Sequence, residues 1–355
     1  PQRIVATLAR AWPLLTIPMF IMLGEIFKVG GISRRLVDVA NIFFGKLPGG
    51  LGIVNIVASY FFGGISGSAS ADTAAIGGIM IPAMIEEGYD SKFSTVVTIT
   101  SSTLGPIVPP SVLVILIAWV TDLPVGALFL AGYTPAFLTM LGLIILTYIL
   151  SRLRNYPRHG RPPFKQALKI IFEAVPALIT PFIIVGGIVF GIVTAVEASS
   201  VALIYGCIVA GFFYKELQLK DVRQILKNSV EITASIGLLL AFASGFSWLI
   251  TYSQLPYHLA ERLTTAHVGP IAFMMLSCGV FLILGTFLNP GAIVLMIMPV
   301  LFPGARMLGF HPIHFALICA LSMVIGYVTP PVGLCLFIGC SISGDNIEDL
   351  IRPLI

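Results

Sequence analysis

Long apolar stretches without charge, separated by short polar segments, are the main pattern along this chain. No Asp, Glu, Lys or Arg occurs at 93–121, 123–151, 174–196 or 307–344. Each stretch can hold about 20 apolar residues, the length at which a helix crosses a hydrocarbon core of roughly 30 Å. The pattern therefore predicts an all-α polytopic membrane protein.

Within these stretches, one short motif occurs twice. The sequence GPIVPP at 105–110 recurs as GYVTPP at 326–331, and both 326 − 105 and 330 − 109 equal 221. Proline lacks a backbone N–H group and cannot continue a helix, so each motif predicts a discontinuous helix inside the membrane. Two helices broken in corresponding halves of one chain are a strong indication of a transporter binding site.

An uncharged run with small and polar residues at its centre precedes each broken helix. The second run covers 268–305, and its 38 residues would measure about 57 Å as one helix, nearly twice the membrane core. As two limbs, at 269–284 and 291–305, each reaches only about 20–25 Å. The first run is interrupted in the same way at 63–72. Both runs predict re-entrant hairpins, although two ordinary short spans in each place are an alternative.

The basic loops orient the chain in the membrane. One loop holds five basic residues at 152–165, and the next holds four at 215–227. Two predicted spans, 174–191 and 197–213, separate them, so both loops lie on one side, which the positive-inside rule makes cytoplasmic. Counting spans in both directions makes the two broken helices begin on opposite faces. The predicted repeat is therefore inverted.

The predicted elements divide the chain into six segments. Charged and apolar residues mixed at helical spacing predict interfacial helices at 31–46 and 254–267, as arms or as simple connectors. We expect both ends of the sequence to be truncated. The predicted segments are a scaffold helix and interfacial helix (1–47), a first hairpin and broken helix (48–121), scaffold spans (122–253), a second interfacial helix (254–268), a second hairpin and broken helix (269–344), and the start of a C-terminal segment (345–355).

Composition supports the membrane prediction and excludes other classes. The 355 residues are 57% hydrophobic and 10% charged, against about 25% charged in soluble domains. The net charge of +4 needs no nucleic-acid partner to explain it, because the basic residues lie in short loops between spans, and we expect no nucleic-acid partner. The five cysteines lack metal-ligand spacing. The sequence GISG at 64–67 matches a motif of intramembrane serine proteases, but the histidines all lie in loops or near span ends, so no enzyme is predicted.

The broken helices predict cation sites. Carbonyl groups before each proline lose their helical partners, and an unsatisfied carbonyl at membrane depth costs several kcal/mol. Sodium ions take carbonyl and hydroxyl oxygens as ligands; Ser101 precedes the first break and Thr329 lies inside the second. A proline kink satisfied by neighbouring side chains is the alternative. Because two kinks occur in register, each behind a hairpin, we expect paired cation sites.

The hairpin tips predict an anion site between them. Asp72 and Asn289 are suitable N-cap residues, so each returning limb would point its positive end at the protein centre. With Ser66, Ser68 and Ser70, these helix ends suit an anion such as a carboxylate. An acid inside the membrane is a functional candidate by default, but capping its own helix explains Asp72 more simply.

Four segments of the chain resemble one family of transporters. They are FFGGISGSASADTAAIGGIMIPAMIEEGYD at 61–90, TLGPIVPPS at 103–111, GTFLNPG at 285–291 and GYVTPPVGLCLF at 326–337. Together they are similar to the large membrane subunit of tripartite ATP-independent periplasmic (TRAP) transporters, and the resemblance covers essentially the whole chain.

The resemblance implies an elevator-type secondary transporter in the bacterial inner membrane. It would import an organic acid, such as a C4-dicarboxylate or sialic acid, with sodium as the coupling ion and no other cofactor. Its expected partners are a small membrane subunit and a periplasmic substrate-binding protein. A stand-alone carboxylate transporter of the same architecture and a passive channel are the rival interpretations.

The resemblance and the residues above together provide the candidate sites. The family's first sodium site corresponds to the 66–68 tip with the 105–108 carbonyls, and its second to the 285–289 tip with the second break. Relatives often carry an acid where this chain has Asn289. The candidate sodium ligands are Ser66, Gly67, Ser101, Gly105, Val108, Gly285, Gly326 and Thr329. The candidate substrate-binding residues are Ser66, Ser68, Asp72, Ser111 and Asn289.

Overall fold

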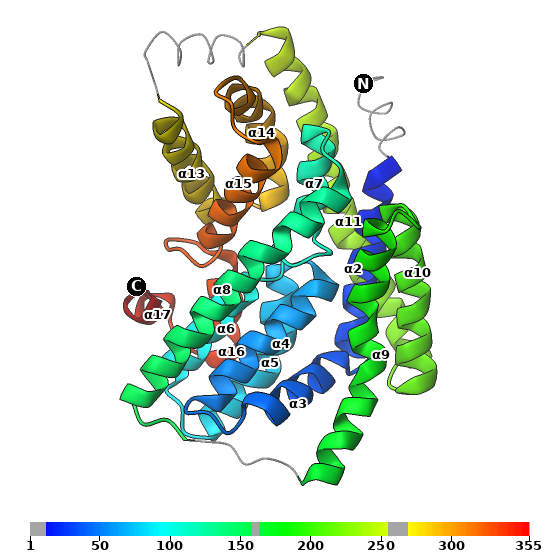
Figure 1. Ribbon diagram of the computed structural model, residues 1–355, viewed down its shortest axis with the longest axis vertical. Helices are drawn as coiled ribbons and strands as arrows, with labels where there is room; N and C mark the ends of the chain where they lie inside the picture. The colour runs from blue at the N-terminus through cyan, green and yellow to red at the C-terminus, as the bar shows by residue number, and fades with distance from the viewer. Residues whose placement is uncertain (1–11, 158–162, 255–268, 355) are drawn as a thin grey trace.

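The computed structural model describes residues 12–157, 163–254 and 269–354, and every regular element in these ranges is helical (Figure 1). Six of the described helices are long and apolar enough to cross a membrane. They confirm the predicted all-α polytopic membrane fold. These helices are α8 (Val125–Leu153), α9 (Phe164–Val189), α10 with its π-helical end η2 (Ala195–Phe213), α11 (Leu219–Tyr252), α13 (Pro270–Phe287) and α14 (Pro290–Met307).

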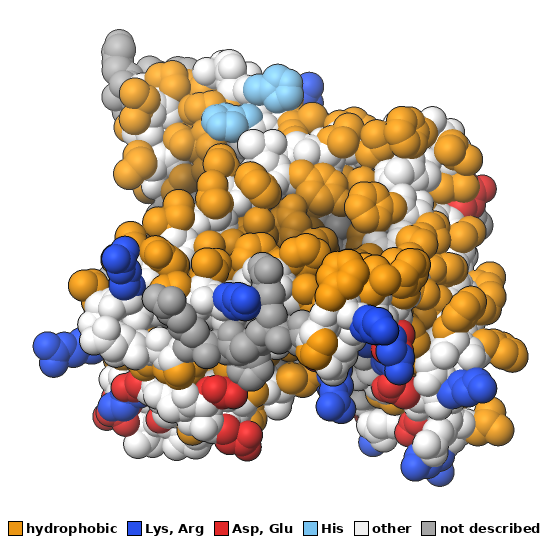
Figure 2. Space-filling model, turned by 60° about the horizontal axis from the view of Figure 1, so that its bottom comes forward, with side chains coloured by type: hydrophobic (Ala, Val, Ile, Leu, Met, Phe, Trp, Pro, Cys, Tyr) orange, Lys and Arg blue, Asp and Glu red, His pale blue; other side chains and the backbone are white. Residues whose placement is uncertain are grey.

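Charged and apolar side chains separate on the molecular surface. Figure 2 shows charged side chains gathered toward the lower end of the molecule and hydrophobic side chains covering the flank above them. The long helix α8 exposes large apolar side chains along its length, among them Leu138, Ile145 and Leu146. A broad apolar flank suits contact with lipid or with another membrane subunit.

The first described helices make a bent pair. They are η1 (Trp12–Leu15), α2 (Thr16–Val29) and α3 (Ile32–Phe44). α2 and α3 meet at 68°, and Gly31 between them has a φ of +67°, which glycine adopts without a steric penalty. α3 buries Ile32, Leu36 and Ala40 on one face. The amphipathic helix expected over 31–46 is therefore present, whereas the one expected over 254–268 lies outside the described residues.

The first hairpin joins two helices through only two residues. These helices are α4 (Gly50–Ser66) and α5 (Ala69–Glu86). α4 ends where Gly67 takes a left-handed φ of +60°, and α5 begins directly after Ser68. The irregular tip predicted at 63–72 is therefore wrong in its extent. Most of its small residues are helical, because tertiary packing overrides weak intrinsic helix propensity.

The second hairpin is organised in the same way and lies where the sequence predicts it. α13 ends before Leu288, whose backbone is extended. Asn289 then caps α14, which has Pro290 in its first turn. Ser68 and Asn289 each start a returning limb, and 289 − 68 equals 221, the spacing of the sequence repeat. The two tips therefore correspond residue by residue at their caps.

Each hairpin is followed by a helix that is interrupted at its Pro-Pro motif, and both Pro–Pro bonds are cis. The halves are α6 (Ser91–Ser102) and α7 (Val112–Thr121), then α15 (Pro312–Gly326) and α16 (Leu334–Ser343). α5 packs against α16, and α14 packs against α7. The returning limb of each hairpin therefore contacts the broken helix that follows the other hairpin. Figure 1 shows α4, α5 and α6 in the lower part of the molecule and α13, α14 and α15 in the upper part. The inverted orientation in the membrane stays a prediction.

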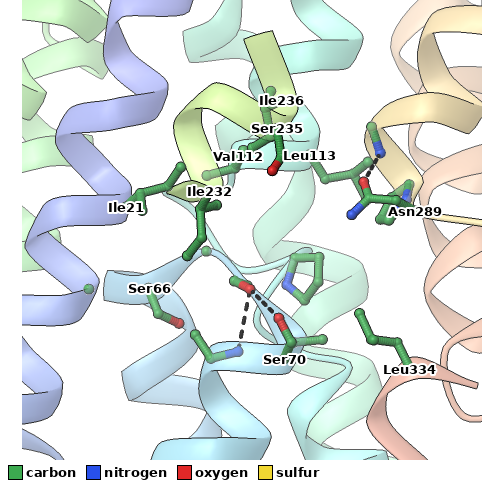
Figure 3. A pocket seen from close by; sticks show the side chains of 18 of the residues that line it. Ile21, Ser66, Ser70, Val112, Leu113, Ile232, Ser235, Ile236, Asn289 and Leu334 are labelled. Carbon is green, nitrogen blue, oxygen red and sulfur yellow. Dashed lines mark hydrogen bonds between the residues drawn. The ribbon is translucent and has the colours of Figure 1, made fainter. Parts of the chain in front are cut away.

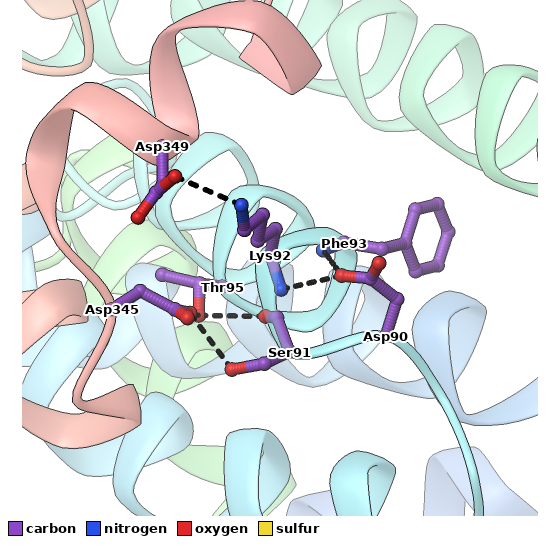
Figure 4. Close-up of polar contacts among 7 residues, drawn as sticks. All are labelled: Asp90, Ser91, Lys92, Phe93, Thr95, Asp345 and Asp349. Atoms are coloured by element: carbon purple, nitrogen blue, oxygen red, sulfur yellow. Dashed lines mark hydrogen bonds and ion pairs between the residues drawn. The ribbon is translucent and has the colours of Figure 1, made fainter.

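The C-terminal segment is held by polar contacts at the N-terminal end of α6. Asp345 accepts a hydrogen bond from the Ser91 hydroxyl at 2.8 Å (Figure 4). The Lys92 ammonium pairs with the Asp349 carboxylate at 2.9 Å. Asp349 belongs to α17, which is Ile347–Leu354. With a third contact from the Thr95 hydroxyl to Asp345 at 3.3 Å, these interactions hold α17 and the residues before it against the start of the first broken helix.

Replacing Asp349 by asparagine is expected to loosen α17, because the substitution removes its ion pair with Lys92. The Lys92 ammonium lowers the pKa of the Asp349 carboxyl. The pair therefore contributes above the ordinary carboxyl pKa of about 4, and the contribution is lost as the pH falls through the lowered value. Hydrogen exchange at pH 7 should be faster over 347–354 in Asp349→Asn and unchanged in α5. Equal exchange over 347–354 in both proteins would contradict the tether.

Candidate functional site

The first tip and the first break touch backbone to backbone. A Cβ atom on Gly105 would lie 3.0 Å from the Ser68 carbonyl oxygen, and one on Gly67 would lie 2.7 Å from the Pro110 carbonyl oxygen. A Cβ on Gly63 would lie 2.7 Å from the Cα of Gly105. Only glycine allows two backbones to approach so closely. This packing places the tip directly on the segment where helical hydrogen bonds are interrupted.

The second tip and the second break are packed in the same way. A Cβ on Gly285 would lie 2.5 Å from the Met323 carbonyl oxygen, and one on Gly326 would lie 2.6 Å from the Gly285 carbonyl carbon. Beside them, the Gly333 N–H donates a hydrogen bond of 3.1 Å to the Thr286 carbonyl. The structure therefore brings the predicted residues Gly285 and Gly326 into direct contact.

Oxygen atoms without hydrogen-bond donors collect at the first break. The Leu104 carbonyl accepts from Ile107 N and Val108 N, at 3.0 and 2.8 Å. No described residue donates to the carbonyl oxygens of Gly105 or Val108. The Ser66 residue is 3% exposed, and its hydroxyl also has no partner among the described residues. Buried oxygens are rarely left unpaired, so these atoms are suitable ligands for a dehydrated cation.

Other predicted sodium ligands already have hydrogen-bond partners. The Gly326 carbonyl accepts from Thr329 N at 3.1 Å, and the Thr329 hydroxyl donates to the Ile325 carbonyl at 2.8 Å. A donating hydroxyl keeps lone pairs that can face a cation. Ser101 is fully buried before the first break, where its hydroxyl donates to the Thr98 carbonyl at 2.9 Å. Ser101, Gly326 and Thr329 therefore each take part in a hydrogen bond within the chain.

One cavity of about 480 Å³ lies between the two tips (Figure 3). In Figure 3, Ser66 and Ser70 of the first tip face Asn289 of the second across this space. Residues of α2, α7, α11 and α16 line other parts of the wall. Among the predicted substrate residues, the cavity is lined by Ser66, Ser68 and Asn289, together with Gly67 from the sodium set.

Asp72 does not lie where the sequence suggests. The N-cap of α5 is Ser68, whose extended backbone follows the left-handed Gly67 and whose hydroxyl accepts from Ala71 N at 3.4 Å. The prediction that Asp72 caps this helix is therefore wrong, because the helix begins one turn earlier. Asp72 is fully buried outside the cavity lining, with the hydroxyl of Ser102 beside it.

Ser111 is also fully buried and lies outside the cavity lining. Its hydroxyl donates to the Pro106 carbonyl and accepts from Val114 N at 3.2 Å, which makes Ser111 the N-cap of α7. These two hydrogen bonds link the interrupted segment to the first turn of α7. Its hydroxyl is therefore occupied by backbone groups of its own segment.

The cavity wall includes polar residues that the sequence analysis does not single out, among them two charged ones. Glu25 and Lys28 come from α2, and Ser235 comes from α11. A sequence signal for one of them exists, because Glu25 is the single acid between Arg10 and Lys28 in an otherwise apolar run. Ser235 has no such signal, since only packing brings the middle of α11 to the tips.

The predicted role of Asn289 as a helix cap is confirmed. Its side-chain oxygen accepts a hydrogen bond of 2.9 Å from Gly291 N, and Pro290 occupies the first turn. The positive end of α14 therefore faces the cavity, because Asn289, Pro290 and Gly291 all line it.

Replacing Asn289 by alanine is expected to destabilise the protein by about 1 kcal/mol, because the N-cap hydrogen bond is lost. Asn289→Asp keeps an acceptor oxygen at the same place and should retain the stability. Thermal unfolding of the purified protein, followed for both variants beside the wild type, measures the difference. Equal midpoints for the two variants would show that the cap contributes nothing.

The family model described as "Tripartite ATP-independent periplasmic transporter, DctM component" matches residues 2–355. The chain belongs to this family. It is thus a large TRAP permease, a multi-pass protein of the bacterial inner membrane and a transporter component, not an enzyme. Large permeases of this family work with a small permease and a periplasmic binding protein.

Curated relatives match this permease over most of their length. An uncharacterized protein of Salmonella typhimurium, YgiK, is 40% identical over 96% of this chain and 79% of its own. The C4-dicarboxylate TRAP transporter large permease protein DctM of Pseudomonas aeruginosa is 36% identical, over 96% of this chain and 80% of its own. The sialic acid TRAP transporter large permease protein SiaM of Vibrio cholerae is 35% identical with the same coverage.

A solved structure has the same fold. The YdaH transporter of Alcanivorax borkumensis aligns with a TM-score of 0.64, covering 100% of this permease and 84% of its own chain. The two sequences are 15% identical, so the similarity concerns the fold alone.

Proposed function

We propose that this TRAP permease imports an organic acid across the bacterial inner membrane, driven by sodium and supplied by a periplasmic binding protein. The observation that carries the proposal is one cavity that residues of both hairpin tips line. A small membrane subunit completes the transporter in this proposal. The substrates named for relatives in Pseudomonas aeruginosa and Vibrio cholerae, a C4-dicarboxylate and sialic acid, are both organic acids.

The acid group would bind between the ends of two helices. Ser68 and Asn289 mark the N-termini of α5 and α14, and both line the cavity. Helix N-termini carry free N–H groups and a partial positive charge, which together favour an anion. Hydroxyl groups of Ser66 and Ser70 on the same wall would accept or donate the remaining hydrogen bonds.

Sodium would bind where the tips meet the breaks. The first site would use the carbonyls of Gly105 and Val108 with the hydroxyl of Ser66, since these oxygens lack donors among the described residues. The second would use the tip around Gly285 and the break around Thr329. With an ion in place, the oxygens of tip and break are held together, and the ordered tip then presents its N–H groups to the acid.

Transport would follow an elevator mechanism. The hairpins and broken helices at 48–121 and 269–344 would move as one unit against the spans at 122–253 and the helix α2. Two contacts support a sliding boundary: Ser66 lies on Gly24 of α2, where a Cβ would be 3.5 Å from the Ser66 Cα, and apolar residues of α11 face the tips. Small and apolar contacts can slide past one another without breaking ion pairs.

Reconstituted uptake tests the proposal. The permease with its small subunit and binding protein should accumulate labelled N-acetylneuraminate or succinate in vesicles when sodium outside exceeds sodium inside. Uptake should fall to background when potassium replaces sodium. An unchanged rate without a sodium gradient would contradict sodium coupling, and accumulation without the binding protein would favour a stand-alone transporter.

A further inference from the structure

Two opposite charges from α2 lie in the wall of the cavity. Glu25 and Lys28 are three positions apart, so they lie on the same side of this helix, and both line the cavity. Lys28 is exposed, and it makes no hydrogen bond or ion pair with any described residue. Lys28 therefore contributes to the cavity wall a side chain whose ammonium group has no partner among the described residues.

The carboxylate of Glu25 is only partly engaged. One of its oxygens, Oε2, accepts a hydrogen bond of 2.8 Å from the Asn228 side-chain amide on α11. Asn228 also accepts from the Gln224 amide at 2.7 Å, which fixes its orientation. No described residue donates to the other oxygen of Glu25, so one oxygen can accept a hydrogen bond from a bound molecule.

The remaining described residues of the cavity wall are neutral. The polar ones are mainly serines of the first tip, the amide of Asn289 and the hydroxyl of Ser235. These groups suit hydroxyl and amide substituents of a substrate. A substrate with two acid groups would find only one cation here and would bring its second carboxylate near Glu25. Like charges placed together in a binding site are strongly disfavoured.

We propose that Glu25 and Lys28 make this permease selective for an acid with one carboxylate and several hydrogen-bond donors, such as a sugar acid, over a dicarboxylate. The inference rests on the proposed import of organic acids. Lys28 attracts the single carboxylate as it enters or leaves the cavity. Glu25 repels a second carboxylate and accepts a hydrogen bond from a hydroxyl group instead.

Binding of two probe acids to the purified complex of large and small subunits tests the selectivity. Gluconate carries one carboxylate and several hydroxyls, whereas succinate carries two carboxylates and no hydroxyl. In sodium, the wild type should bind gluconate more tightly. Glu25→Gln keeps an amide oxygen that can accept from Asn228 but removes the charge, so it should shift the affinity ratio toward succinate by roughly tenfold.

Two further variants control the experiment. Lys28 is exposed, so Lys28→Met should fold normally. It should lower the affinity for both acids by a similar factor of roughly tenfold. Glu231→Gln makes the same acid-to-amide change on α11 at an exposed position outside the cavity, and it should change neither affinity.

The outcomes separate the selectivity from the proposed function. Tighter binding of succinate to the wild type, or an unchanged ratio in Glu25→Gln, would overturn the role of Glu25 while leaving acid transport intact. Equal affinities of Lys28→Met and the wild type would overturn the role of Lys28. If the wild type binds neither probe nor N-acetylneuraminate, the proposed import of organic acids fails, and the inference fails with it.

Discussion

Gly285→Ala is expected to abolish sodium-driven uptake, whereas Gly279→Ala on the same helix should leave uptake unchanged. A Cβ on Gly285 would lie 2.5 Å from the Met323 carbonyl oxygen and 3.2 Å from the Met323 Cα, so a backbone would have to move. At Gly279 no atom lies within 4 Å of the added Cβ. Both changes have the same effect on helix propensity, so only the contact with the second broken helix distinguishes them.

The size of the effect follows from the packing. Forcing an extra methyl group between two closely packed backbones costs about 1–3 kcal/mol or more, and it separates the second tip from the second break. Uptake in vesicles and thermal unfolding of the same preparations measure both consequences. Normal uptake by Gly285→Ala would contradict a functional contact between tip and break. A defect in Gly279→Ala would mean that any change in this helix is harmful.

Ser66→Ala is expected to lower the apparent sodium affinity by roughly tenfold or more, with little change in stability without sodium. The Ser66 hydroxyl is buried and has no partner among the described residues, so its removal breaks no hydrogen bond of the protein itself. A hydrogen-bonding group that meets a charge contributes about 1.5–3 kcal/mol, and each 1.4 kcal/mol is a factor of ten. The loss should therefore appear only when the ion is bound.

Ser33→Ala is the matched control for this experiment. Ser33 lies on α3, is 3% exposed, and its hydroxyl also lacks a partner among the described residues, but it does not line the cavity. Thermal unfolding with increasing sodium should show the wild-type response in Ser33→Ala and a response displaced to higher sodium in Ser66→Ala. Identical sodium titrations of Ser66→Ala and the wild type would exclude the Ser66 hydroxyl as a ligand.

Local chemistry explains which parts of the site were predictable from the chain. Asn289 was recognisable as a cap because an Asn-Pro pair at a helix start has one common geometry, and the structure has it. Asp72 was misassigned because the same rule allows several caps in a row of small polar residues. The cap is Ser68, directly after Gly67, whose close approach to the Pro110 carbonyl is a tertiary feature.

The hydrophobic pattern and the repeated Pro-Pro motif determined the all-helical membrane fold, the two hairpins and the two breaks. These features depend on the length of apolar runs and on missing N–H groups, which are properties of neighbouring residues. Only the tertiary structure decided that Glu25 and Lys28 share a cavity with Asn289. Residues more than 200 positions apart meet through the packing of whole helices, and no local rule specifies which faces of those helices come together.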